Sequence, residues 1–212
     1  MLGTHDLWLF VMAGLLLNIT PGPDTLYIVG RSSAQGTQAG TVAALGIGTG
    51  TLVHICAAAL GLSALLAASA AAFMLVKVAG AAYLVYVGVS LILSRSSGGP
   101  SPGGSVLPSA SLRTVFLQGF FTNVLNPKVA LFFLAFLPQF VAADASSKPL
   151  AFLLLGVIFD FNGTLWNLFV GWSAARISTR LGATRRFTTW FNRCIGSLFV
   201  FIGVRLVLAH DR

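Results

Sequence analysis

Residues Gly14–Asp24 read GLLLNITPGPD, and they have a counterpart at Gly119–Lys128, which reads GFFTNVLNPK. Each stretch has a glycine, then an asparagine four residues later, then a proline and a charged residue. Both lie inside long apolar runs. A proline lacks the backbone N–H and clashes with the preceding helical turn, so both runs predict helices that are broken near their middle.

These apolar runs belong to a chain of 212 residues with 56% hydrophobic and 8% charged residues. Soluble domains carry about 25% charged residues, so this chain has too few charges to cover a soluble globule. Disordered chains are excluded as well, because they combine low hydrophobicity with many charges. We therefore expect an integral membrane protein with no room for a second, soluble domain.

Six apolar runs are long enough to cross a bilayer as helices. They are Leu7–Val29, Gly40–Leu66, Phe73–Leu93, Val115–Val141, Leu150–Ala175 and Phe187–Ala209. The first run has no Lys or Arg before it and no small-residue cleavage site, so we expect it to be a retained span. The Ser-, Gly- and Pro-rich segment 95–113 has the composition of a flexible linker.

The linker divides one all-α membrane domain, residues 1–212, into a first repeat of about residues 1–94 and a second of about residues 114–212. Each repeat contains three expected spans and begins with a broken helix. With three spans per repeat, the second repeat must enter the membrane from the opposite side. This arrangement is an inverted-topology repeat, which is typical of secondary transporters.

The charge distribution predicts the orientation. The net charge is +8, from 13 Lys and Arg against 5 Asp and no Glu. The first, third and fifth loops contain most of the loop cations, whereas the opposite side has only Lys148 and Arg212. The cations of the odd loops are Arg31, Arg95, Arg113, Arg176, Arg180, Arg185 and Arg186. By the positive-inside rule, the odd loops face the cytoplasm and both termini face outward. Charges this thinly spread do not form a nucleic-acid patch.

The broken helices are candidates for a binding site. Backbone carbonyls released at Pro21, Pro23 and Pro127 cannot face lipid unsatisfied, so they must line a cavity or bind to neighbours. A simple proline kink is the alternative, but two breaks at matching places, each followed by a charge, favour a binding site. The substrate-binding candidates are Asn18, Thr20, Pro21, Gly22, Pro23, Asp24, Asn123, Asn126, Pro127 and Lys128.

Asp24 and Lys128 are the sharpest of these candidates. An ionisable group in a span costs at least about 2.5 kcal/mol near the bilayer centre, so it usually faces a partner or a wet cavity. The two residues could pair with each other, or they could receive the ammonium and carboxylate groups of a zwitterion. The residue pattern leaves both interpretations open.

Other polar residues inside the spans have two interpretations each. Gly46, Gly50 and His54 recur every four residues and share one stripe, which we interpret as a packing face. His54 could relay protons, or it could be a neutral histidine bonded to a backbone carbonyl. Asp160 is either a partner of Arg193 or Arg205 or a proton-carrying group. Asp24, Asp160 and His54 are therefore the candidates for proton coupling, and Lys77 and Arg193 can reach the interface from helix ends.

The two cysteines, Cys56 and Cys194, lie far apart in apolar runs. This placement suggests neither a disulfide framework nor a metal site. We expect no metal and no cofactor.

The motifs resemble those of the LysE (lysine exporter) family of bacterial amino-acid efflux proteins, including its homoserine/threonine-exporter branch. The matching segments are NITPGPD at Asn18–Asp24, GIGTGTLVH at Gly46–His54, ALGL at Ala59–Leu62, KVAGAAYLVYVG at Lys77–Gly88, FLQG at Phe116–Gly119, NPK at Asn126–Lys128, and, more weakly, RCIG at Arg193–Gly196 and GVRL at Gly203–Leu206. The resemblance implies a six-helix exporter of amino acids or their derivatives in the bacterial inner membrane, driven by the proton gradient. Its expected partners are a small-molecule substrate and the lipid bilayer, and homo-oligomerisation is left open.

Three other functional classes are less well supported. A membrane-embedded enzyme would be expected to have a G-x-S-x-G nucleophile elbow, an H-E-x-x-H motif or paired intramembrane aspartates, and the predicted spans contain none of these. A transmembrane electron carrier would need redox cysteines beside the broken helices. An exporter of an ion or other small metabolite on the same scaffold is the main alternative, although ion sites prefer several Asp, Glu or His ligands.

Overall fold

A computed structural model describes residues 2–62, 109–142 and 144–177, together with single positions 78, 82, 85, 86, 89, 93, 197, 200 and 204. Within these residues the elements are helices, and the only β pairing is one isolated bridge between Thr4 and Val141. The predicted all-α class is therefore confirmed for this part of the chain. Several predictions fall outside the described residues: most of the spans Phe73–Leu93 and Phe187–Ala209, most of the linker, and Lys77, Arg193, Cys194 and Arg205.

The first predicted span is broken, as expected. Helix α1 (Leu7–Ile19) ends before Thr20, and helix α2 (Pro23–Ala57) begins three residues after that point, with Pro23 in its first turn. Proline suits that position because its missing N–H would have no partner there in any case. The predicted end of the span at Val29 was wrong, since the helix continues to residue 35.

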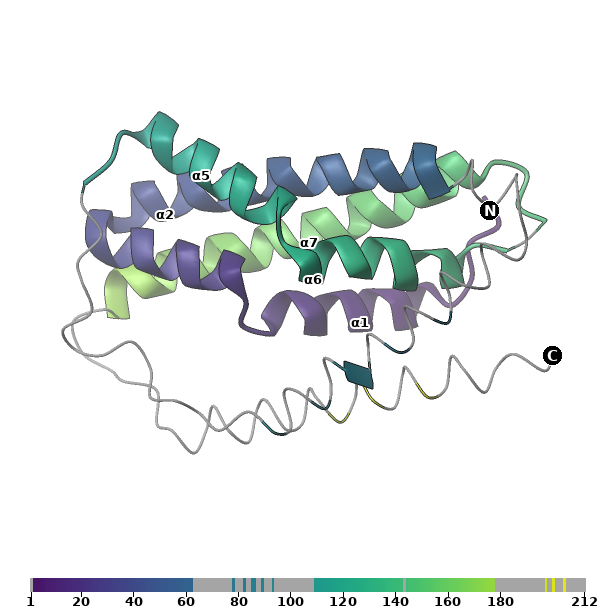
Figure 1. Ribbon diagram of the computed structural model, residues 1–212. Helices are drawn as coiled ribbons and strands as arrows, with labels where there is room; N and C mark the ends of the chain where they lie inside the picture. Colours follow the sequence, from purple (N-terminus) through teal and green to yellow (C-terminus); the bar gives the residue numbers. More distant parts are fainter. Residues whose placement is uncertain are drawn as a thin grey trace.

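Helix α2 folds back on itself at Gly36. This residue has φ 81° and ψ −175°, a left-handed conformation that favours glycine. The hydroxyl of Ser32 lies against Gly40, although a continuous helix would hold those two residues about 12 Å apart. Figure 1 shows the two parts of α2 side by side. We call residues 23–35 the first arm of α2 and residues 37–57 the second arm.

The fold-back corrects two sequence predictions. The second span begins at residue 37 and not at Gly40, and it continues through the π-helical segment η1 (Ala58–Leu62). The first loop is a single turn at Gly36 and not a longer connection. Apolar patterning places a span but does not show where one helix bends sharply into the next.

The second half repeats the broken-helix design. Helix α5 (Leu112–Val124) starts at Ser111, whose hydroxyl caps it by accepting from the Thr114 amide at 3.2 Å. After a break, helix α6 (Pro127–Leu131) continues into the π-helical η2 (Phe132–Phe136) and the 3₁₀-helical η3 (Leu137–Phe140), bent by 44° from α5. Helix α7 (Lys148–Ile177) follows. The predicted spans Val115–Val141 and Leu150–Ala175 thus match, with bounds shifted by up to three residues.

The lengths of these helices suit a membrane. Within the described residues, Lys148–Arg176 is long and apolar enough to cross a bilayer, and α5 with its bent continuation is another candidate. The segment Pro23–Gly61 has the required length and composition as well, although it is folded back at Gly36. Helix α1 is shorter and also apolar.

The two broken helices run in opposite directions along each other (Figure 1). As the residue number rises from α1 into the first arm of α2, the number of the contacting residue falls. Phe10 contacts Phe136, Leu17 contacts Lys128, and Tyr27 contacts Gln118. The two breaks consequently lie at the same level of the bundle.

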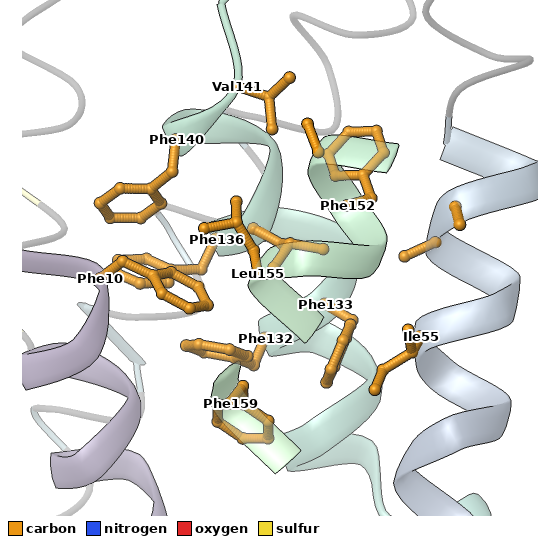
Figure 2. Close-up of a cluster of buried hydrophobic side chains, with 14 of the residues drawn as sticks. Phe10, Ile55, Phe132, Phe133, Phe136, Phe140, Val141, Phe152, Leu155 and Phe159 are labelled. Atoms are coloured by element: carbon orange, nitrogen blue, oxygen red, sulfur yellow. The ribbon is translucent and has the colours of Figure 1, made fainter. Parts of the chain in front are cut away.

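An aromatic cluster packs the bundle on one side of the breaks (Figure 2). Phe10 of α1 lies edge-on to Phe140, and Phe132 of η2 stacks on Phe159 of α7 with ring centroids 4.6 Å apart. Offset and edge-to-face arrangements of this kind stabilise aromatic pairs beyond simple burial. The cluster ties α1, the α6 continuation and α7 together.

Small residues bring the second arm of α2 against α5. A Cβ atom at Gly50 would lie 2.7 Å from the Phe120 carbonyl, and one at Gly46 would collide with the Phe116 carbonyl. On the facing helix, a Cβ atom at Gly119 would lie 2.7 Å from the Ala43 carbonyl. The predicted packing role of the Gly46, Gly50 and His54 stripe is therefore confirmed. In lipid, small residues at an interface allow helix backbones to approach closely and so to associate.

Candidate functional site

The break after α1 releases backbone carbonyls from the helical ladder. In a continuous helix, the amide of residue 21 would donate to the Leu17 carbonyl, but residue 21 is proline and has no N–H. Thr20 is extended, with ψ 121°, so its own carbonyl also leaves the helical ladder. The Leu16 carbonyl stays satisfied, because it accepts from the Thr20 backbone amide at 3.0 Å and from the Thr20 hydroxyl at 2.7 Å.

The break after α5 is held by an asparagine. The Asn126 amide donates to the Asn123 carbonyl at 2.9 Å, and the Asn126 side-chain oxygen accepts from the Lys128 amide at 3.0 Å. Asn126 is therefore the N-cap of α6, with Pro127 in the first helical position. The chain turns here without losing the hydrogen bonds that start the next helix.

Lys128 connects the two breaks. Its ammonium donates to the Leu17 carbonyl at 2.6 Å and to the Thr20 carbonyl at 2.7 Å, two of the carbonyls that the first break releases from the helical ladder. The side chain of Lys128 passes over Gly22, at 3.6 Å from the position that a Cβ atom would take there. The Lys128 ammonium at the second break thus donates hydrogen bonds to backbone carbonyls at the first break.

A small cavity of about 20 Å³ lies between the breaks. A volume of this size holds roughly one water molecule. Its lining comes from α1, the first arm of α2, the α6 break and α7, and comprises Leu17, Asn18, Gly22, Asp24, Thr25, Asn126, Lys128, Val129 and Asn167.

The two carboxylate oxygens of Asp24 differ in their hydrogen bonding among the described residues. Asp24 Oδ2 accepts from the Asn123 side-chain amide at 2.9 Å. Asp24 Oδ1 is buried and has no hydrogen-bond partner among the described residues. Of the described residues, Asp24 and Lys128 form no ion pair with each other, so direct pairing is not the arrangement in this conformation.

Asn18 supplies an unpaired donor to the same region. Its side-chain nitrogen is buried and has no partner among the residues that the structure describes. The amide lies against Gly163 of α7, where an added Cβ atom would be 3.0 Å away. A buried amide donor and a buried carboxylate acceptor without partners are expensive unless something binds them.

Asn123 is the centre of a polar network behind the cavity. It is only 2% exposed, and its side-chain oxygen faces the Thr51 hydroxyl at 3.3 Å. Its backbone carbonyl lies 3.1 Å from His54 Nε2, and the His54 ring stacks on Phe133. The structure therefore places His54 against a backbone carbonyl, which is one of the two interpretations that the sequence allowed.

Asp160 lies outside the cavity lining. Its carboxylate accepts from the Thr164 hydroxyl at 3.5 Å and faces Gly48 and Thr51 of the second arm of α2. Because Thr51 also contacts Asn123, a chain of polar side chains runs from Asp160 to Asp24. The alternative partners of Asp160, Arg193 and Arg205, lie outside the described residues.

The structure brings most of the predicted binding residues together and adds others. Asn18, Gly22, Asp24, Asn126 and Lys128 line the cavity, whereas Thr20, Pro21, Pro23, Asn123 and Pro127 shape or support it. Thr25 and Asn167 also line it, and sequence reasoning had not included them. The available signals were a hydroxyl beside Asp24 and an amide inside an otherwise apolar span.

A second polar cluster lies toward the Gly36 end of the bundle. Arg31 is only 5% exposed and donates to Gln118 Oε1 at 2.7 Å and to Gln35 Oε1 at 2.9 Å. The Tyr27 hydroxyl donates to the Val115 carbonyl at 2.7 Å, and the Arg31 guanidinium lies over the Tyr27 ring. Arg31 is thus a buried helix residue that joins α2 to α5, and its prediction as a loop cation was wrong.

A groove of about 500 Å³ follows the same helices. It is lined by Tyr27, Thr114, Leu117, Gln118, Phe121, Thr122 and Leu125. Leu125 belongs to the break after α5, so the groove extends from that break toward the Arg31 cluster.

Comparisons with known proteins match nearly the whole chain. The family model for the LysE type translocator matches residues 15–210. An uncharacterized membrane protein of Pseudomonas aeruginosa is 30% identical over 98% of this chain and 97% of its own length. A leucine efflux protein of an Enterobacter species is 27% identical over 98% of each chain. An uncharacterized membrane protein of Bacillus subtilis is 28% identical over 97% of this chain and all of its own length. No solved structure matches the chain.

Proposed function

Since the chain belongs to the family of LysE type translocators, we propose that this membrane protein exports amino acids or their derivatives across the bacterial inner membrane. Family membership confirms the resemblance that the sequence motifs indicated. Relatives named leucine efflux protein make leucine the first substrate to test.

The observation that carries the proposal is the pair of unsatisfied polar atoms between the two breaks. Asp24 Oδ1 is a buried acceptor, and the Asn18 side-chain nitrogen is a buried donor. An amino acid offers the complementary pair, because its ammonium donates and its carboxylate accepts. We assign the ammonium to Asp24 and the carboxylate to Asn18, with Thr25, Asn126 and Asn167 as neighbouring polar groups.

The small size of the cavity fits a transporter in a closed conformation. A space of about 20 Å³ has no room for an amino acid, so the two broken helices must separate before a substrate enters. We propose that the halves form an inverted repeat that alternates access to this point. The opposed directions of the two broken helices support that arrangement.

We also propose the predicted orientation, with the first, third and fifth loops in the cytoplasm and both termini outside. The Gly36 turn, next to Arg31, would then lie on the cytoplasmic side. The groove beside Tyr27 and Gln118 would connect that side to the break after α5. The aromatic cluster would close the outer side.

Proton coupling belongs to the proposal as well, with Asp160 as its main carrier. His54 has its ring nitrogen against a backbone carbonyl, and Asp24 is reserved for the substrate. Asp160 lies behind Thr51 and Asn123, so its protonation can change the orientation of the group that holds Asp24. The exported amino acid and the proton would then use separate carboxylates.

The decisive experiment is transport by the purified protein in liposomes. A panel of amino acids is loaded, and efflux is measured with and without an imposed pH gradient. We expect efflux of leucine or a similar amino acid, acceleration by the gradient, and loss of efflux in Asp24→Asn with normal membrane insertion. Asp160→Asn should export at a rate that no longer responds to the gradient.

Each part of the proposal can fail separately. Efflux of no amino acid, with efflux of an ion or another small metabolite in the same assay, would establish the alternative cargo. A rate that ignores the gradient in the unmodified protein would refute proton coupling alone. Unchanged efflux in Asp24→Asn would refute the assignment of the ammonium.

A further inference from the structure

We propose that the Lys128 ammonium is a tethered cation that fills a monovalent-cation site at the broken end of α1. The protein then needs no inorganic cation to assemble its binding site. For its consequence in transport, the inference rests on the proposed exporter function. Its consequence for cation binding is independent of that function.

The broken end of α1 has the chemistry of a cation site. Pro21 frees the Leu17 carbonyl, and the extended backbone at Thr20 turns a second carbonyl toward the same point. Carbonyls at the C-terminal end of a helix hold partial negative charge. Backbone carbonyls are also the groups that replace the hydration shell of a monovalent cation in membrane proteins.

The lysine is held in this site against an unfavourable local field. Lys128 is the second residue of α6, where the positive end of the helix dipole disfavours a cation. Two short hydrogen bonds to the α1 carbonyls, at 2.6 and 2.7 Å, compensate for that position. The close passage of the side chain over Gly22 leaves little freedom for it to point elsewhere.

Charge balance explains why a tethered cation suits this site. The cavity lining contains one carboxylate, Asp24, and one ammonium, Lys128, so a zwitterion adds no net charge. Without the lysine, the same space would contain a carboxylate and two free carbonyls. Those oxygens would attract a small inorganic cation. We therefore expect removal of Lys128 to convert a cation-independent site into a cation-dependent one.

Thermal unfolding of the purified protein in detergent tests the site directly. Unmodified protein, Lys128→Ala and Lys128→Met are compared in choline, sodium and potassium chloride. Lys148→Ala is the matched control, because Lys148 is the first residue of α7 and lies outside the cavity lining. Lys128→Met keeps most of the side-chain volume without the charge.

We expect sodium or potassium to raise the unfolding temperature of Lys128→Ala, saturably, above its value in choline. For each of the other three proteins, the unfolding temperature should be the same in all three salts. In these proteins the carbonyl site at the end of α1 is either filled by the side chain of residue 128 or unchanged. A Lys128→Ala protein that is equally unstable in all three salts, or folds in none of them, would overturn the proposal. A sodium or potassium effect of the same size on the unmodified protein would overturn it as well.

Leucine efflux from liposomes tests the consequence for transport. The unmodified protein should work within about twofold in choline and sodium, whereas Lys128→Ala should gain about tenfold when sodium or potassium replaces choline. Full activity of Lys128→Ala in choline would contradict the inference. If the unmodified protein exports no leucine in any salt, the proposed function fails, and the unfolding measurements still decide the cation site.

Discussion

The side-chain amide of Asn123 donates a 2.9 Å hydrogen bond to Asp24 Oδ2 and joins two residues that are 99 positions apart in the chain. It fixes the carboxylate so that the other oxygen, Oδ1, stays free at the cavity. Asn123 also contacts Thr51 and, through its backbone, His54. One buried amide therefore orients the carboxylate to which we assign the substrate ammonium.

Replacing Asn123 with alanine should reduce leucine efflux by about 10- to 100-fold. A hydrogen bond to a charged group contributes about 1.5–3 kcal/mol, and without it Asp24 loses its orientation. Efflux from liposomes checks this. The control is Thr49→Ala, whose hydroxyl donates to the Leu45 carbonyl within its own helix and lines neither the cavity nor the groove. Equal efflux from both variants would remove Asn123 from the site.

Replacing His54 with glutamine should preserve both efflux and its response to a pH gradient. The glutamine amide can still donate to the Asn123 carbonyl, although it cannot carry a proton near neutral pH. His54→Leu should lose activity, because the Asn123 carbonyl then keeps only the Asn126 backbone amide as a donor. If His54→Gln exports leucine at a rate that does not respond to the pH gradient, His54 carries the proton, and the assignment to Asp160 is wrong.

Replacing Gln118 with leucine should lower the free energy of unfolding by about 1.5–3 kcal/mol. Gln118 is an acceptor for the buried Arg31 guanidinium, and leucine cannot accept. Chemical unfolding in detergent measures the change. The neighbouring substitution Leu117→Ala, at an exposed position, should cost less than about 0.5 kcal/mol. Equal costs would mean that the contact between Arg31 and Gln118 contributes nothing to stability.

Replacing Gly46 with valine should prevent normal packing of α2 on α5. The added side chain meets the Phe116 backbone carbonyl, which cannot move without moving the helix. We expect little folded protein by size-exclusion chromatography in detergent. Gly61→Ala is the comparison, since none of the residues that the structure describes lies within 4 Å of the added methyl group there. A well-folded Gly46→Val protein would mean that the two helices are not held this close.

Replacing Gly36 with alanine should destabilise the protein by about 1–3 kcal/mol, although no described residue lies within 4 Å of the added methyl group. The cause is the backbone, because φ 81° with ψ −175° is strained for a residue with a Cβ atom. Gly61→Ala again provides the reference, as a glycine without positive φ. Equal stability of the two variants would indicate that the turn can adopt an ordinary conformation.

The positions of both helix breaks followed from the sequence alone. Proline acts on its own backbone, so Pro21, Pro23 and Pro127 interrupt their helices whatever surrounds them. The membrane class followed in the same way from 56% hydrophobic residues, which is a property of composition. The packing stripe of Gly46, Gly50 and His54 could be predicted because helical periodicity places residues four apart on one face.

The partner of each polar group could not be predicted this way. Lys128 binds the carbonyls of Leu17 and Thr20, which lie more than 100 residues away in the chain, and no local pattern encodes that contact. Arg31 was predicted to be a loop cation. The turn at Gly36 instead leaves it within α2, where it contacts Gln118 of α5. Asn167 lines the cavity because α7 passes beside the two breaks, and the sequence does not show where α7 lies.

Composition and backbone chemistry are local, and they are enough to predict a membrane protein whose first and fourth spans are broken at proline. The packing of distant helices sets three further features: the breaks face each other, Lys128 binds backbone carbonyls and not Asp24, and Asn123 holds the carboxylate. These outcomes depend on antiparallel packing of distant helices. Hydrogen-bond partners are set by distances of about 3 Å, and such distances exist only after the helices have packed.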